Sequence, residues 1–419
     1  MRKILAILTA LLLVSCSLNH DEVVVSMKQN ATTKITKEQA LKNLYGELKI
    51  IDAESRAGGE ARKVKSIKSL VGAKTRSGNA LDNDLLYIVE FEEGQGSAVL
   101  AADNRLEPVI AVLDSDVMTA EDFASDDMDD IGAQMASMIE DYATFASITT
   151  SIPLLPAPGH SVRDTIYRVH VHPLLTTKWG RNYPYNGLSI DEADSYDLPT
   201  SVVACAQILK YYNGPSVINN TNINWSLLSF VENKGRLLNF TSAYSEVAKL
   251  MSLLVDMDMS SYSILQSLGY DVESVSVPDE AFLDTDGLNI IKESITEHRP
   301  VIMSATVNEM MGPYHAWVVD GCLDYTARYI RAVERIGNIE TGETIVEYIT
   351  QETEYNKLHC NFGEDGKFDG YYTYRIFNLG IPNYDIDESV GDKTHCIADY
   401  ADEYSYYYNH NISMTLIEE

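Results

Sequence analysis

A helix and two later strands, each with a polar residue near one end, most constrain how this chain can fold. The segment 200–212 has helical spacing and is mostly apolar after a hydroxyl-bearing start. Far along the chain, one apolar strand segment opens with His315 and another ends near Asn361. A helix N-terminus lowers the pKa of a thiol, a histidine can act as base, and an asparagine can orient it. In this order the three segments indicate the parts of a cysteine–histidine–asparagine site.

The cysteine count excludes a disulfide-stapled scaffold. Five cysteines in 419 residues are too few for one, and no pair has the CxxC spacing of structural zinc. We therefore expect no metal site and no cofactor. The chain must fold around ordinary apolar cores, and its length suits two or three domains. The cysteines are Cys16, Cys205, Cys322, Cys360 and Cys396.

The first sixteen residues have the pattern of a bacterial lipoprotein signal peptide. Arg2 and Lys3 precede an apolar run, residues 4–14, that is too short to span a bilayer. Cys16 stands where cleavage is expected, so its thiol is predicted to carry the lipid. The expected location is the bacterial cell envelope, at the outer membrane or cell surface. An ordinary signal peptide with a chance cysteine is the alternative.

The charge excludes another class of function. A formal net charge of −30 argues against nucleic acid and against direct adhesion to anionic lipid, so the lipid anchor is the expected membrane contact. Residues 106–162 carry eleven acidic residues and no Lys or Arg. They lack the alternation and glycine of a calcium loop, so we interpret them as a solvated loop followed by a helix at 131–146.

The order of patterns predicts an α+β protein. Thr36 looks like the cap of a helix, residues 53–83 have loop composition, and strands are expected at 86–91, 96–101 and 106–113. Prolines at 153–159 mark a linker. The expected divisions are 1–16 signal peptide, 17–35 tether, 36–115 small α+β domain, 116–164 acidic connector and linker, and 165–419 second domain with mixed helices and strands.

Several short motifs together resemble the streptopain family of papain-like cysteine peptidases. The hairpin and the residues 101–105 that follow it are similar to the family's Spi-type inhibitory propeptide. This resemblance implies a papain-like fold (a helical part and an antiparallel sheet), a zymogen blocked by its own propeptide, and polypeptide substrates. It suggests a Bacteroides-type lipoprotein member. The motifs are Trp179-Gly180-Arg181, Ala206-Gln207-Ile208, His315-Ala316-Trp317-Val318-Val319-Asp320-Gly321 and His359-Cys360-Asn361-Phe362-Gly363.

When the family's site is aligned with this sequence, two catalytic positions have the family's residue and three site positions have a different one. His315 falls on the catalytic histidine, and Asn361 falls on the asparagine that positions it. Counting back from Ala206-Gln207-Ile208 places Thr200 on the nucleophilic cysteine. Arg181 stands where the family has the glutamine that donates to the oxyanion, and Glu364 stands where a tryptophan walls the site.

Cys205 is a poor substitute nucleophile. It lies five residues after Thr200, so on a helix its side chain is turned by about 140° from that position. We expect it to be a buried structural cysteine. Thr200, or Ser201 with a one-residue shift, could in principle be activated by His315, but an alcohol lacks the low pKa of a thiol.

The sequence therefore favours a weak or inactive peptidase, a pseudo-peptidase. Relaxed catalytic demand explains the three clustered changes more simply than a new mechanism does. Two alternatives stay open: an active peptidase that uses Thr200, Ser201 or Cys205, and a surface protein that inhibits proteases or binds peptides. A purely structural adhesin is disfavoured because nothing repeats along the chain.

Overall fold

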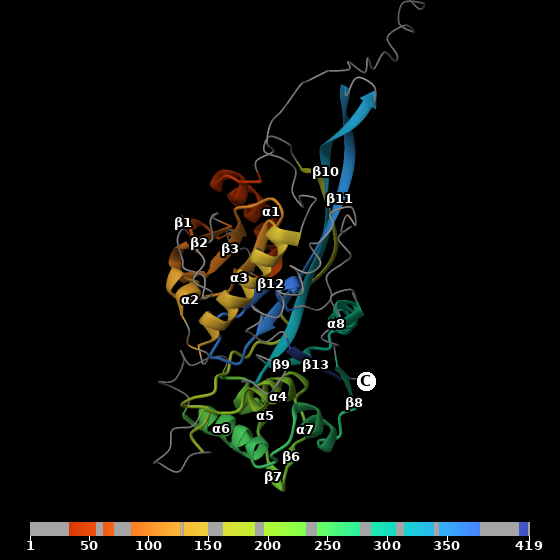
Figure 1. The fold of residues 1–419 in the computed structure, drawn as a ribbon. Coiled ribbons are helices and arrows are strands. Elements are labelled where there is room, and N and C mark those ends of the chain that lie inside the picture. Colours follow the sequence, from red (N-terminus) through yellow and green to blue (C-terminus); the bar gives the residue numbers. More distant parts are fainter. Residues whose placement is uncertain are drawn as a thin grey trace, which may run out of the picture.

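The computed structural model describes residues 33–55, 62–70, 85–125, 127, 130–149, 162–188, 197–231, 241–276, 286–306, 314–338, 343–377 and 410–417. Helices flank one large antiparallel sheet, which confirms the predicted α+β class (Figure 1). Cys16, Cys396 and the 153–159 linker lie outside the described residues. Within the described ranges, no helix is both long and apolar enough to cross a bilayer.

The N-terminal region packs one helix against a small set of strands. Helix α1 (Lys37–Ser55) starts as predicted, because the Thr36 hydroxyl accepts a hydrogen bond from the Gln39 amide at 3.3 Å. Leu44 and Leu48 are fully buried on its inner face. The helix packs on β3 (Ser97–Ala101) and β4 (Val109–Leu113). Strand β2 (Leu86–Phe91) pairs with β3, and the short 3-10 helix η1 (Glu92–Gly94) joins the two.

The loop prediction for residues 53–83 is wrong at one place. Residues Val64–Ser69 form β1, which pairs antiparallel with β2 at the edge of the sheet. Its sequence, VKSIKS, is rich in lysine and serine. Charged side chains are typical of edge strands, because they discourage pairing with another chain. Here the lysines and serines led to the prediction of a loop.

The C-terminal part of the sheet is built from long strands. The order continues from β4 through β12 (Gly370–Thr373), β11 (Glu343–Asn361), β10 (Tyr314–Asn338), β9 (Val301–Thr306) and β13 (His410–Ile417) to β8 (Val272–Ser276). Strand β5 (Val162–Val171) also pairs with β10. Strands β10 and β11 extend as a two-stranded ribbon well beyond the body of the protein (Figure 1).

The two parts of the sheet join at β4 and β12. Gly370, Tyr371 and Tyr372 pair with Leu113, Val112 and Ala111, so the sheet runs without a break from β1 to β8. One buried apolar core contains residues from both sides of this junction, including Leu100 and Tyr372.

A second core lies under the helices at one end of the sheet. Helix α4 (Thr200–Tyr212) packs against α6 (Thr241–Val255), α7 (Ser261–Ser267) and the start of β10. The remaining elements there are α5 (Trp225–Leu228), the small hairpin β6 (Val217–Ile218) and β7 (Thr221–Asn222), and α8 (Asp286–Thr296), which packs on β9 and β10.

The acidic connector is more ordered than predicted. It contains the short helix α2 (Ala120–Ala124), whose start is stabilised by a reciprocal capping box between Thr119 and Asp122. The predicted helix at 131–146 is confirmed as α3 (Ile131–Thr149), which packs on the 3-10 helix η4 (Tyr374–Phe377). The acidic residues therefore do more than solubilise a loop, since some of them fix its conformation.

Candidate active site

Thr200 is the first residue of α4, as the sequence predicts. Its side chain is buried, and its hydroxyl oxygen accepts a hydrogen bond of 2.9 Å from the backbone N–H of Ala316. This bond ties the helix start to the strand segment that carries His315. The helix dipole is positive here and would favour an anionic nucleophile, but an alcohol is not ionised at neutral pH.

His315 is the second residue of β10 and is buried. Its Nε2 lies 3.1 Å from the carbonyl oxygen of Phe362 and donates to it, and its ring packs near the rings of Trp317 and Phe362. Burial lowers the pKa of His315 to about 4, and the positive charge of Arg181 adds to the effect. The imidazole is therefore neutral at physiological pH.

Asn361 is the last residue of β11, and its side chain forms hydrogen bonds with three other residues of the chain. Its Oδ1 accepts from Gln207 Nε2 at 2.9 Å and from the Gly363 amide at 3.2 Å, and its Nδ2 donates to the Thr177 carbonyl at 2.8 Å. The hydrogen bonds described for Asn361 do not reach the imidazole. The adjacent Phe362 carbonyl accepts from His315 Nε2, and the role of Asn361 in orienting His315 stays a prediction.

Arg181 and Glu364, the two further positions that the resemblance predicts to be altered, form an ion pair. Arg181 Nη1 lies 3.3 Å from Glu364 Oε1, and Arg181 Nε donates to the Leu198 carbonyl at 2.6 Å. Burial raises the pKa of Glu364, and the guanidinium opposes that shift. The guanidinium thus connects the Glu364 loop to Leu198, two residues before Thr200.

Cys205 is a structural cysteine, as predicted. It is fully buried, and its Sγ lies 3.7 Å from the Ser261 carbonyl. Burial raises the pKa of its thiol to about 12. A thiol with such a pKa, bonded away from His315, cannot supply a thiolate at neutral pH.

Gln207 was used in the sequence only to align the helix, yet it is central to the site. It is fully buried on α4, accepts from the Trp179 amide at 3.2 Å and donates to Asn361. It therefore joins the helix, the Trp179 segment and the end of β11. A buried glutamine in an apolar helix was the signal that could have found it, because such a group needs partners.

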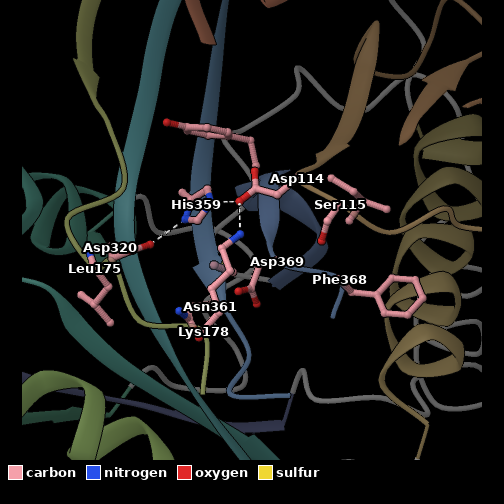
Figure 2. Close-up of polar contacts among 12 residues, drawn as sticks. Asp114, Ser115, Leu175, Lys178, Asp320, His359, Asn361, Phe368 and Asp369 are labelled. Carbon is pink, nitrogen blue, oxygen red and sulfur yellow. Dashed lines mark hydrogen bonds and ion pairs between the residues drawn. The ribbon is translucent and has the colours of Figure 1, made fainter. Parts of the chain in front are cut away.

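A second polar cluster, missed from the sequence, lies behind the site at the β4–β12 junction (Figure 2). His359 Nδ1 lies 2.6 Å from Asp320 Oδ1, and its Nε2 lies 3.4 Å from Asp114 Oδ2. Lys178 Nζ donates to the same Asp114 oxygen at 2.9 Å. The carboxylates raise the pKa of His359 to about 10 against the opposing effect of burial, so His359 is protonated.

The arrangement places the predicted site residues together with a threonine, and no thiol, at the first position of α4. It brings Thr200, His315, Asn361, Arg181 and Glu364 into one region. It offers a hydroxyl bound to a backbone amide, a neutral histidine and an ion pair between Arg181 and Glu364. Among the described residues, no group of His, Cys, Asp and Glu side chains has the geometry to hold a metal ion.

Comparison with known proteins places this region in a family. Residues 179–372 match the profile of the Peptidase C10 family. No curated protein matches the sequence. Two solved structures are similar. A fragment of Prevotella intermedia prointerpain A is 18% identical, with a TM-score of 0.48, over 85% of this chain and 98% of that one. Active wild-type interpain A cysteine protease from Prevotella intermedia is 20% identical, with a TM-score of 0.36, over 59% and 95%. Residues 179–372 of the chain belong to the Peptidase C10 (streptopain) family.

Proposed function

We propose that this protein is a lipid-anchored member of its family whose peptidase site is inactive and which binds polypeptides or proteins without cutting them. The observation that carries the proposal is the Arg181–Glu364 ion pair beside Thr200. The missing thiol alone would remove the nucleophile. The ion pair also fills the space in which a substrate carbonyl would be polarised.

The histidine supports the same interpretation. A cysteine peptidase of this kind uses a thiolate beside an imidazolium, which requires a histidine that holds a proton. Burial lowers the pKa of His315 to about 4, and the Thr200 hydroxyl accepts its hydrogen bond from Ala316. Loss of a single oxyanion donor costs on the order of 100- to 1,000-fold in rate, so the combined changes should remove measurable turnover.

The test is hydrolysis of casein and of a fluorogenic peptide library by the chain from residue 17 onward. We expect no turnover by the wild type, and none by the double variant Thr200→Ser with Arg181→Gln. We expect detectable turnover by Thr200→Cys with Arg181→Gln, since this restores the thiol and the amide donor. Wild-type hydrolysis that disappears in His315→Ala would overturn the proposal.

The anchor is tested separately. Cys16 at the end of a short signal sequence supports attachment of lipid to its thiol and a place in the cell envelope. Cells fed an alkyne-tagged fatty acid should label the wild-type protein and leave Cys16→Ser unlabelled. Equal labelling of both proteins would rule out lipidation at this residue.

A further inference from the structure

The polar interior of the β4–β12 junction joins the N-terminal region to the rest of the chain. Lys357 Nζ on β11 is fully buried and lies 3.5 Å from carboxylate oxygens of both Glu47 and Glu107. It also donates to the Val109 carbonyl at 2.6 Å. All three partners belong to the N-terminal region, so the charge of a buried lysine on one side is neutralised entirely from the other.

The same pattern recurs beside it. Arg375 Nε lies 2.8 Å from Glu107 Oε1, and the Tyr325 hydroxyl donates to Glu47 Oε1 at 2.5 Å. Glu107 is fully buried. Burying a charge is costly unless an opposite charge lies close to it, so these buried cations and carboxylates require both regions to be in place.

A turn after β4 forms a third set of contacts. Asp114 accepts from Lys178 and lies near His359, and its amide donates to the Asp369 carbonyl at 2.9 Å (Figure 2). Asp116 Oδ2 accepts from the Phe368 amide at 3.0 Å. Lys178 precedes Trp179, and His359 precedes Asn361 by two positions. The turn therefore contacts two of the chain segments from which the candidate site is built, the one before Trp179 and the one before Asn361.

We propose that the N-terminal region, residues 36–115, is a permanent part of the folded protein and not a removable propeptide. A propeptide that is shed must leave behind a domain with its own closed core and satisfied polar groups. Here, separation would uncover Tyr371 and Tyr372, open the β12 edge to pairing with other chains and strip Lys357 of its carboxylates. Retention of the region is independent of the loss of activity, since an active enzyme could also keep it.

In the experiment that tests this proposal, a protease cuts the chain at a point outside the β4–β12 junction. A recognition sequence for a site-specific protease replaces residues 153–159, and the purified protein is cut at that point. The cut sample is then followed in a urea series. Size-exclusion chromatography reports separation of the two fragments, and near-ultraviolet circular dichroism reports the environment of the buried Trp179 and Trp317.

We expect the fragments to stay together in buffer and to separate at the urea concentration at which the tryptophan signal is lost. Asp114→Asn should lower both midpoints together, and the exposed Asp271→Asn should leave both unchanged. Separation at a urea concentration where the tryptophan signal persists would show that the C-terminal fragment folds alone. Such a result would overturn the proposal, as would an Asp114→Asn variant in which only the separation midpoint moves.

Discussion

Arg181 and Glu364 lie 3.3 Å apart in the candidate site, at two positions that the family resemblance predicts to be altered. The two side chains are 25% and 17% exposed, so the pair is shielded from solvent. The opposite charges at the two positions therefore compensate each other electrostatically.

This pair should be coupled energetically. Glu364→Gln leaves the guanidinium without its charged partner and should lower the free energy of unfolding by about 1–3 kcal/mol. Arg181→Gln with Glu364→Gln should cost less than the sum of the two single variants, because neither charge is then left alone. Urea unfolding of all four proteins measures the coupling. Additive effects would show that the pair contributes nothing.

The Cys205 thiol should not react with alkylating reagents in the folded protein. With the pKa of its buried thiol raised to about 12, only about one molecule in ten thousand is a thiolate at pH 8. Mass spectrometry after iodoacetamide treatment should find Cys205 modified in urea and unmodified in buffer. Thr200→Cys provides the comparison at the helix start. Rapid native labelling of Cys205 would return it to consideration as a nucleophile.

His359 should make stability fall at alkaline pH. Its pKa is raised to about 10 by Asp320 and Asp114, so the folded state holds a proton that the unfolded chain releases near pH 6.5. The stabilisation is complete below pH 6.5 and disappears as pH rises through about 10, with about 1.4 kcal/mol lost for each pH unit between the two pKa values. His359→Gln should flatten this decline between pH 7 and 10 in urea unfolding experiments.

Neighbouring groups titrate in other pH ranges, so the decline in stability between pH 7 and 10 can be assigned to His359. Burial raises the pKa of Asp369 to about 7, so its own effect is lost between about pH 4 and 7. Lys178 titrates higher, because Asp114 holds its pKa above the usual value against burial. An unchanged alkaline slope in His359→Gln would contradict the assignment of a proton to this ring.

Gly370 should be irreplaceable at the sheet junction. A Cβ there would meet the Val112 carbonyl oxygen at 2.4 Å and Leu113 Cα at 2.8 Å, and neither backbone atom can move easily. Gly370→Ala should cost about 1–3 kcal/mol through overpacking. Gly46→Ala is the matched control, since nothing lies within 4 Å of a Cβ at this position in α1, and it should stabilise the helix by about 1 kcal/mol. Equal stability of the two variants would contradict close packing of β4 on β12.

The local features of the fold were predictable from the sequence. The capped start of α1, helix α3 and the start of α4 at Thr200 follow from short-range spacing and capping, which act within one or two turns. The placement of His315 and Asn361 at strand ends also came from local composition, aided by family resemblance. Strand β1 was missed because its lysines and serines suit an edge position and break the apolar pattern.

The junction could not be predicted in the same way. Pairing of Leu113 with Gly370 joins residues that lie far apart in the chain, and no periodicity within β4 or β12 specifies that partner. From the sequence, Glu107 was counted only as one of eleven acidic residues, and Lys357 was given no role. Their burial follows from tertiary packing, which also decided the roles of Asp114 and His359.

The strand order of the sheet determines how late in synthesis the chain can complete its native fold. Strand β13, from residues 410–417, lies between β9 and β8, and β12 must meet β4 across most of the chain. Loops of this length close slowly, and the contacts that stabilise them form only after closure. The sheet therefore stays incomplete until residues 410–417 have been synthesised. If the chain crosses a membrane during synthesis, its early apolar strands must be shielded from aggregation throughout that time.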